Sequence, residues 1–166
     1  MSGPMLLPDD IVALAARVIA ENRAAGRMVT VAESCTGGLV AAALTEIAGS
    51  SAVLDRGFVT YTNEAKRELL GVPAEILDTF GAVSVATAWS MAQGALKASG
   101  ADVAVAISGI AGPDGGSEHR PVGTVVFARA IRGSDEVNAE EKRLDGSSRA
   151  SVRHQATLVA LELLLP

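Results

Sequence analysis

One short segment gathers hydroxyl, thiol and glycine residues at a point where a strand is expected to give way to a helix. It is the hexapeptide Glu33-Ser34-Cys35-Thr36-Gly37-Gly38. A serine at such a turn can attack a carbonyl carbon while backbone N–H groups at the helix start hold the oxyanion. Cys35 is a rival nucleophile, but no histidine lies close in sequence to activate it, so we expect a buried, inert thiol. A tight turn in which Ser and Thr only cap the helix is the alternative.

A second segment places a phenol close to a lysine. Tyr61 lies near the end of a predicted strand, and Lys66 lies in the first turns of the helix that follows. The positive end of the helix dipole disfavours the charged form of a lysine. This environment suits a general base, because a base must be neutral to accept a proton. A solvated lysine on the helix surface is the alternative.

A glycine-rich loop and an arginine-bearing helix start complete the candidate residues. The loop begins at Ser108, and its glycines, among them Gly109 and Gly112, permit close approach of the backbone to a ligand. It matches neither the P-loop nor the dinucleotide fingerprint, and a flexible surface loop is the alternative. Arg149 and Arg153 are expected in the first turns of the last helix, where a cation opposes the helix dipole. Either an anionic ligand or a salt bridge to an acid would compensate them.

Alternating helical and strand periodicities indicate the elements that must position these residues. They predict an α/β fold, a single-domain three-layer α/β/α sandwich around a mixed sheet, over residues 1–166. Strands are expected over 28–32, 56–62, 102–107, 122–131 and 138–144, the last as a polar edge strand. Helices are expected over 9–25, 39–47, 63–70, 84–99 and 148–165, with a short one starting at 73, and residues 1–8 as a loose tail. The expected helix caps are a carboxylate of the Asp9-Asp10 pair, Asn63, Ser84, and either Ser147 or Ser148.

Composition excludes several classes of protein. The net charge is −5, from 14 basic and 19 acidic residues, and aromatic residues make up 3%. Both values argue against nucleic acid as a partner. No apolar run approaches the roughly 18 residues of a membrane span. The single cysteine and two distant histidines build no zinc pattern, and the first ten residues do not form a signal peptide. We therefore expect a cytoplasmic protein with no metal site.

Taken together, the motifs resemble the C-terminal domain of the CinA family, in its stand-alone form. They occur in the family's order at residues 32–38, 57–66, 81–84, 108–116 and 121–125, so the resemblance covers nearly the whole chain. It implies an α/β sandwich and a nicotinamide-nucleotide amidase. Such an enzyme hydrolyses nicotinamide mononucleotide to nicotinate mononucleotide and ammonia in pyridine-nucleotide recycling. It implies no cofactor and no metal, and a homo-oligomer is allowed.

The resemblance also implies roles for particular residues. Ser34 corresponds to the nucleophile, Lys66 to its base, and Tyr61 to a residue that lines the site. Ser108 stands where the family often has threonine and keeps the hydroxyl, and Arg149 is expected near the substrate. The other residues expected to bind substrate or hold its oxyanion are Thr36, Gly37, Gly109 and Gly112.

Two other functions remain open at this stage. One is a non-catalytic nucleotide-binding or regulatory module, whose glycine-rich loops bind a phosphate without an acyl-enzyme. The other is a different amidase or esterase that uses Cys35. The joint presence of Ser34 and Lys66 favours the serine amidase, because a binding module would not need both residues.

Overall fold

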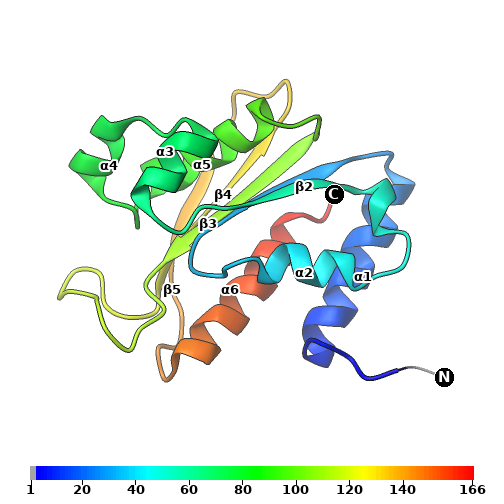
Figure 1. Cartoon of the computed structure of the whole chain (residues 1–166), viewed down its shortest axis with the longest axis horizontal. Coiled ribbons are helices and arrows are strands. Elements are labelled where there is room, and N and C mark those ends of the chain that lie inside the picture. The colour runs from blue at the N-terminus through cyan, green and yellow to red at the C-terminus, as the bar shows by residue number, and fades with distance from the viewer. Residues whose placement is uncertain (1–2) are drawn as a thin grey trace.

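A five-stranded mixed sheet runs through the middle of the molecule in the computed structural model, which describes residues 3–166 (Figure 1). Its order is β2-β1-β3-β4-β5. The first three strands in that order are parallel, and β4 and β5 join antiparallel to them. The strands are β1 (Val29–Glu33), β2 (Leu54–Val59), β3 (Val103–Gly109), β4 (Thr124–Ile131) and β5 (Asn138–Arg143).

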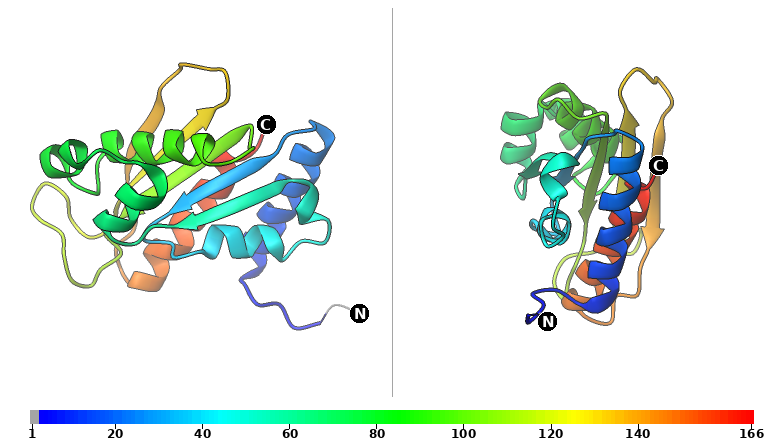
Figure 2. Two further views of the ribbon diagram at one scale, coloured as in Figure 1. Left: turned by 45° about the horizontal axis from the view of Figure 1, so that its top comes forward. Right: turned by 90° about the vertical axis from the view of Figure 1, so that its right-hand side faces the viewer.

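Helices cover both faces of this sheet, which confirms the predicted three-layer α/β/α architecture (Figure 2). One core joins α1, α2 and α6 to the sheet through residues such as Val31 and Phe127. The other core joins α3, α4 and α5 to the opposite face through residues such as Ala32 and Val126. The helices are α1 (Asp9–Ala24), α2 (Leu39–Thr45), α3 (Asn63–Leu70), α4 (Ala74–Phe80), α5 (Val85–Lys97) and α6 (Arg149–Leu163), with a single 3-10 turn η1 (Ser50–Ala52) that was not expected.

The position of each strand follows from its side chains. All five residues of β1 are buried, and β3 is an almost unbroken apolar run, as expected of strands covered on both faces. The polar strand β5 lies at one edge of the sheet, which confirms its predicted position. The strand β2 forms the other edge and ends at Val59, not at residue 62. It ends there because its partner β1 ends at Glu33, directly opposite Val59.

Two predicted helix caps are wrong, and two are confirmed. The N-cap of α1 is Pro8, which makes no side-chain bond, and the acids after it lie in the first turn. Thr62 rather than Asn63 caps α3. Ser84 caps α5, and Ser148 caps α6.

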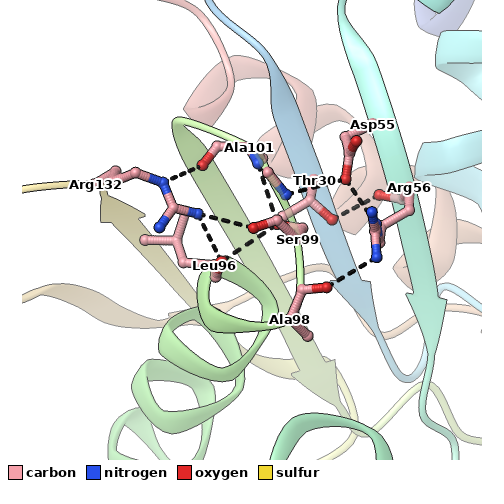
Figure 3. A network of polar contacts seen from close by, with 9 residues as sticks. Thr30, Asp55, Arg56, Leu96, Ala98, Ser99, Ala101 and Arg132 are labelled. Atoms are coloured by element: carbon pink, nitrogen blue, oxygen red, sulfur yellow. Dashed lines mark hydrogen bonds and ion pairs between the residues drawn. The ribbon is translucent and has the colours of Figure 1, made fainter.

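A polar network ties the C-terminal end of α5 to the sheet (Figure 3). The guanidinium of Arg132 donates to the carbonyl groups of Leu96, Ser99 and Ala101 at 2.6, 3.1 and 2.8 Å. Arg56 donates to the carbonyl of Ala98 at 2.9 Å. These arginines bond carbonyl groups at the end of α5 and in the segment that follows it. The network lies at the amino ends of the parallel strands, away from the serine motif, which follows the carboxyl end of β1.

Candidate active site

Ser34 and Lys66, which are 32 positions apart in the sequence, are in direct contact. The Nζ atom of Lys66 lies 2.9 Å from the Oγ atom of Ser34. Ser34 directly follows β1, and Lys66 lies in α3, the helix that follows β2. Because β1 and β2 are adjacent and parallel, their carboxyl ends meet at the same edge of the sheet. The strand order therefore brings the two side chains together.

Two backbone carbonyl groups fix the orientation of the lysine amine. The Nζ atom of Lys66 lies 2.8 Å from the oxygen of Thr60 and 3.2 Å from that of Tyr61. A neutral amine has two N–H bonds and one lone pair. When its N–H bonds are donated to the two carbonyl oxygens, the lone pair is left to accept the hydroxyl proton of Ser34. This arrangement suits proton removal from the serine.

The surroundings of Lys66 favour this neutral form. The residue is 1% exposed, and no ion pair among residues 3–166 includes it. Burial lowers the pKa of Lys66 from 10.5 to about 8, because the charged form loses its hydration. The lowered pKa confirms the prediction, although its cause is burial and not the helix dipole that the sequence suggested. The alternative of a solvated surface lysine is wrong.

The Ser34–Lys66 pair faces a cavity of about 290 Å³. Seven of the residues predicted for the site line this cavity: Ser34, Tyr61, Lys66, Ser108, Gly109, Gly112 and Arg149. Eight further residues line the cavity: Cys35, Ala82, Val83, Ile110, Ala111, Asp114, Gly115 and Gly116. Gly115 and Gly116 belong to the predicted glycine-rich loop, whereas no role was predicted for Ala82, Val83, Ile110, Ala111 or Asp114. Thr36 and Gly37 are not among the lining residues. The side chain of Thr36 is instead fully buried and donates to a carboxylate oxygen of Glu33.

Arg149 lines this cavity and bonds two of its other lining residues. Its Nη1 atom donates to the carbonyl of Gly112 at 2.7 Å, and its Nη2 atom donates to the hydroxyl of Tyr61 at 2.9 Å. Neither partner carries a charge, so the cation remains available to an anionic ligand. Arg153 donates instead to the carbonyl of Cys35 at 3.1 Å and so holds the turn directly after Ser34.

The start of α2 is not the free anion site that the sequence suggested. The carboxylate of Glu33 accepts the backbone N–H groups of Gly38, Val40 and Ala41 at 3.2, 3.0 and 3.1 Å. These donors are therefore occupied within the protein. Sequence reasoning missed this role of Glu33, although an acid just before a turn that opens a helix was visible as a signal.

Cys35 is a poor candidate for the nucleophile. It is 5% exposed, and burial raises the pKa of its thiol to about 11. A reactive cysteine needs the opposite shift, because only the thiolate attacks. The predicted burial of this thiol is confirmed.

Neither a metal cluster nor a membrane helix was found within the part of the chain that the structure describes. Over residues 3–166, no three His, Cys, Asp or Glu side chains are grouped so that they could hold a metal ion. Over the same residues, no helix is long and apolar enough to cross a bilayer.

Fold and site together define a three-layer α/β protein in which a serine meets a buried lysine beside an arginine. A family model described as the CinA C-terminal domain matches residues 11–166, and the chain belongs to this family.

Relatives and solved structures agree with this membership. The chain is 53% identical to a nicotinamide-nucleotide amidohydrolase PncC of Enterobacter agglomerans, with 92% of each chain covered. It is 56% identical to a protein of the same name from Escherichia coli K12, over 86% of this chain and 85% of that one. The crystal structure of the competence/damage inducible protein CihA from Agrobacterium tumefaciens superposes with a TM-score of 0.93, at 55% identity and 97% coverage of both chains.

Proposed function

We propose that this protein hydrolyses the carboxamide of nicotinamide mononucleotide, releasing ammonia and nicotinate mononucleotide. The observation that carries the proposal is the 2.9 Å contact between Ser34 Oγ and the amine of a fully buried Lys66. Relatives that cover most of this chain at 53% and 56% identity are named nicotinamide-nucleotide amidohydrolases. A non-catalytic binding module would gain nothing from burying a lysine against a serine. The reaction would serve the recycling of pyridine nucleotides.

The proposed reaction has two halves. In the first, Lys66 Nζ takes the hydroxyl proton of Ser34 while Oγ attacks the carboxamide carbon, giving a tetrahedral intermediate. The resulting ammonium of Lys66 gives this proton to the departing nitrogen, the C–N bond breaks, and ammonia leaves an ester on Ser34. In the second half, Lys66 takes a proton from water, whose oxygen attacks the ester carbon. The proton returns to Ser34 Oγ as the C–O bond breaks, and the free acid leaves.

Arg149 is proposed to hold the phosphate of the substrate. Its guanidinium is bonded only to uncharged oxygens, those of Gly112 and Tyr61. A phosphate would replace these weaker acceptors with charge-assisted, bidentate hydrogen bonds. Because the protein carries a net charge of −5, a local cation is also needed to attract an anionic substrate. Gly115 and Gly116 line the same cavity, and their lack of side chains leaves room for the ligand.

The test is ammonia release by the purified protein with nicotinamide mononucleotide. Ser34→Ala is expected to abolish turnover and keep the fold. Cys35→Ala serves as the matched control next to it and is expected to retain turnover, because its thiol is buried and protonated. Mass spectrometry after acid quenching is expected to find Ser34 esterified by the carboxyl group of nicotinate mononucleotide, with the ribose phosphate still attached. A folded Ser34→Ala protein that releases ammonia at the normal rate would overturn the serine mechanism.

A further inference from the structure

The side chain of Glu33 is buried beside the nucleophile but plays no part in the chemistry described above. It is fully buried and is not among the residues that line the cavity. Its carboxylate accepts hydrogen bonds from the Thr36 hydroxyl at 2.6 Å and from three backbone N–H groups at 3.0 to 3.2 Å. All four partners are donors, as an ionised carboxylate requires. An acid buried this deeply is retained only when its charge is well compensated.

The four bonds of this carboxylate hold the turn that carries Ser34. The donors lie on residues 36–41, on the far side of Ser34 from β1. This stretch contains two glycines, Gly37 and Gly38, whose φ angles of 57° and 100° lie in a region that other residues rarely adopt. A turn with two such glycines needs an external restraint to keep one geometry. The Glu33 side chain supplies this restraint by bonding across it.

The backbone of Glu33 connects the same turn to the support of the base. Its carbonyl accepts the N–H of Thr60 at 2.8 Å. The carbonyl of Thr60 in turn accepts from Lys66 Nζ at 2.8 Å. One residue therefore contacts both the turn that holds the nucleophile and the strand end that orients the base.

We propose that Glu33 is a positioning residue that holds Ser34 Oγ within hydrogen-bonding distance of Lys66 Nζ. It also occupies the donors at the start of α2, so the anionic part of the substrate binds toward Arg149 and the glycine-rich loop instead. The proposal rests on the proposed function, in which Ser34 is the nucleophile. A displacement of reacting groups by about 1 Å can cost on the order of 100-fold in rate, so loss of the restraint acts mainly on kcat.

Glu33→Gln tests this proposal, because it keeps the size of the side chain and turns one acceptor oxygen into an amide that donates. We expect kcat to fall at least about tenfold, with KM for nicotinamide mononucleotide changed less than about threefold, since Glu33 does not line the cavity. Asn22→Leu is the matched control. Asn22 lies in α1, is equally buried and donates to the carbonyl of Leu164 at 2.9 Å, and it does not line the cavity. The Asn22→Leu variant is expected to have a lower melting temperature and an unchanged kcat.

A second measurement does not depend on the substrate. Phenylmethylsulfonyl fluoride sulfonylates an activated serine and releases fluoride, and mass spectrometry follows its attachment to Ser34. We expect Glu33→Gln to be labelled at least about tenfold more slowly than wild type, and Asn22→Leu at the wild-type rate. Glu33→Asp keeps the charge but is one methylene shorter, and its labelling rate is expected to lie between those of wild type and Glu33→Gln. If Glu33→Gln does not fold, Glu33→Asp takes its place in both measurements.

The outcomes separate the two proposals. Wild-type labelling without ammonia release would overturn the proposed substrate but leave the role of Glu33 to be decided by the variants. Wild-type kcat and labelling in a folded Glu33→Gln or Glu33→Asp protein would overturn the positioning role alone. Equal losses of kcat in Glu33→Gln and Asn22→Leu would also overturn it, because a general loss of stability would then explain both. Absence of both ammonia release and labelling in the wild type would overturn both proposals.

Discussion

A single side chain, that of Lys66, brings together most of what this site needs for catalysis. Burial removes its hydration, and two carbonyl oxygens occupy its N–H bonds. The amine thus combines a lowered pKa with a position 2.9 Å from Ser34 Oγ, where its lone pair in the neutral form can accept the hydroxyl proton. Neither feature requires a third ionisable group, in contrast to triads in which an acid orients the base.

The rate of the reaction should follow the protonation state of Lys66. Only the neutral amine can accept the Ser34 proton, and burial lowers the pKa of Lys66 to about 8. We therefore expect kcat/KM to rise with pH below this value and to level off above it. Lys66→Arg should lower kcat/KM by at least about 100-fold, because a guanidinium stays protonated. Steady-state ammonia release across the pH range measures both, and a flat profile would contradict a role for Lys66 as base.

Arg149 should determine the preference for a phosphorylated substrate. We expect wild type to prefer nicotinamide mononucleotide strongly over nicotinamide riboside, which lacks the phosphate. Arg149→Ala should lose much of this preference, mainly through a higher KM for the mononucleotide. Arg17→Ala removes the same charge from the exposed face of α1 and should leave the preference intact. If the Arg149→Ala enzyme keeps the wild-type ratio of kcat/KM values, the phosphate binds elsewhere.

At the scale of elements, the sequence allowed most helices and strands to be predicted, but not the contacts between them. Hydrophobic periodicity located each main element, and the polar sequence of β5 indicated an edge strand. The end of β2 was misplaced, because it depends on where its neighbour β1 ends. The Ser34–Lys66 contact depends on strand order, which periodicity does not contain. The role of Glu33 was missed because an acid before a helix start does not by itself show which backbone N–H groups its side chain bonds.

The contact between α5 and α3 leaves no space for a side chain at Gly94. A Cβ atom added there would lie 1.9 Å from the carbonyl oxygen of Leu70, the last residue of α3. Helix propensity alone would favour Gly94→Ala by about 1 kcal/mol. We expect the opposite, a loss of about 1–3 kcal/mol in the free energy of unfolding, because α3 must move away. The rate should also fall, because α3 carries Lys66.

Chemical denaturation and ammonia release measure these two effects of Gly94→Ala. Gly100→Ala is the matched control, since a Cβ atom at Gly100 meets nothing within 4 Å. The control should change neither stability nor rate appreciably. If the Gly94→Ala protein is as stable as wild type, α3 and α5 can move apart at little cost in free energy.

At the scale of the whole molecule, the buried lysine should lower stability. The pKa of Lys66 is about 8 in the folded protein, against the usual 10.5 expected in the unfolded chain. Between these two pH values, the unfolded chain therefore binds more protons than the folded protein. Stability should therefore rise with pH across this window. At neutral pH, Lys66→Met should raise the free energy of unfolding by about 1–3 kcal/mol, the order of magnitude that the pKa shift implies.

Urea denaturation of wild type and Lys66→Met at neutral and alkaline pH measures this dependence. The difference between the two proteins should shrink as the pH rises through the window. A constant difference would mean that the lysine keeps its charge without cost in the folded state. Lys66→Met should be inactive, so a gain in stability would accompany a loss of function.

The packing of the first helix against the last has a consequence for how the protein is made. Asp10 at the start of α1 pairs with His154 in α6 at 2.8 Å, and Asn22 in α1 bonds the carbonyl of Leu164 just after α6. Because a ribosome makes the chain from its N-terminus, Ser34 and Lys66 are synthesised long before Arg149, the first residue of α6. Until α6 is made, the nucleophile and its base exist without the arginine that lines the cavity, and one core lacks a helix. The site can be completed only after α6 has been made and packed, so a shorter nascent chain has no finished pocket in which to bind a nucleotide.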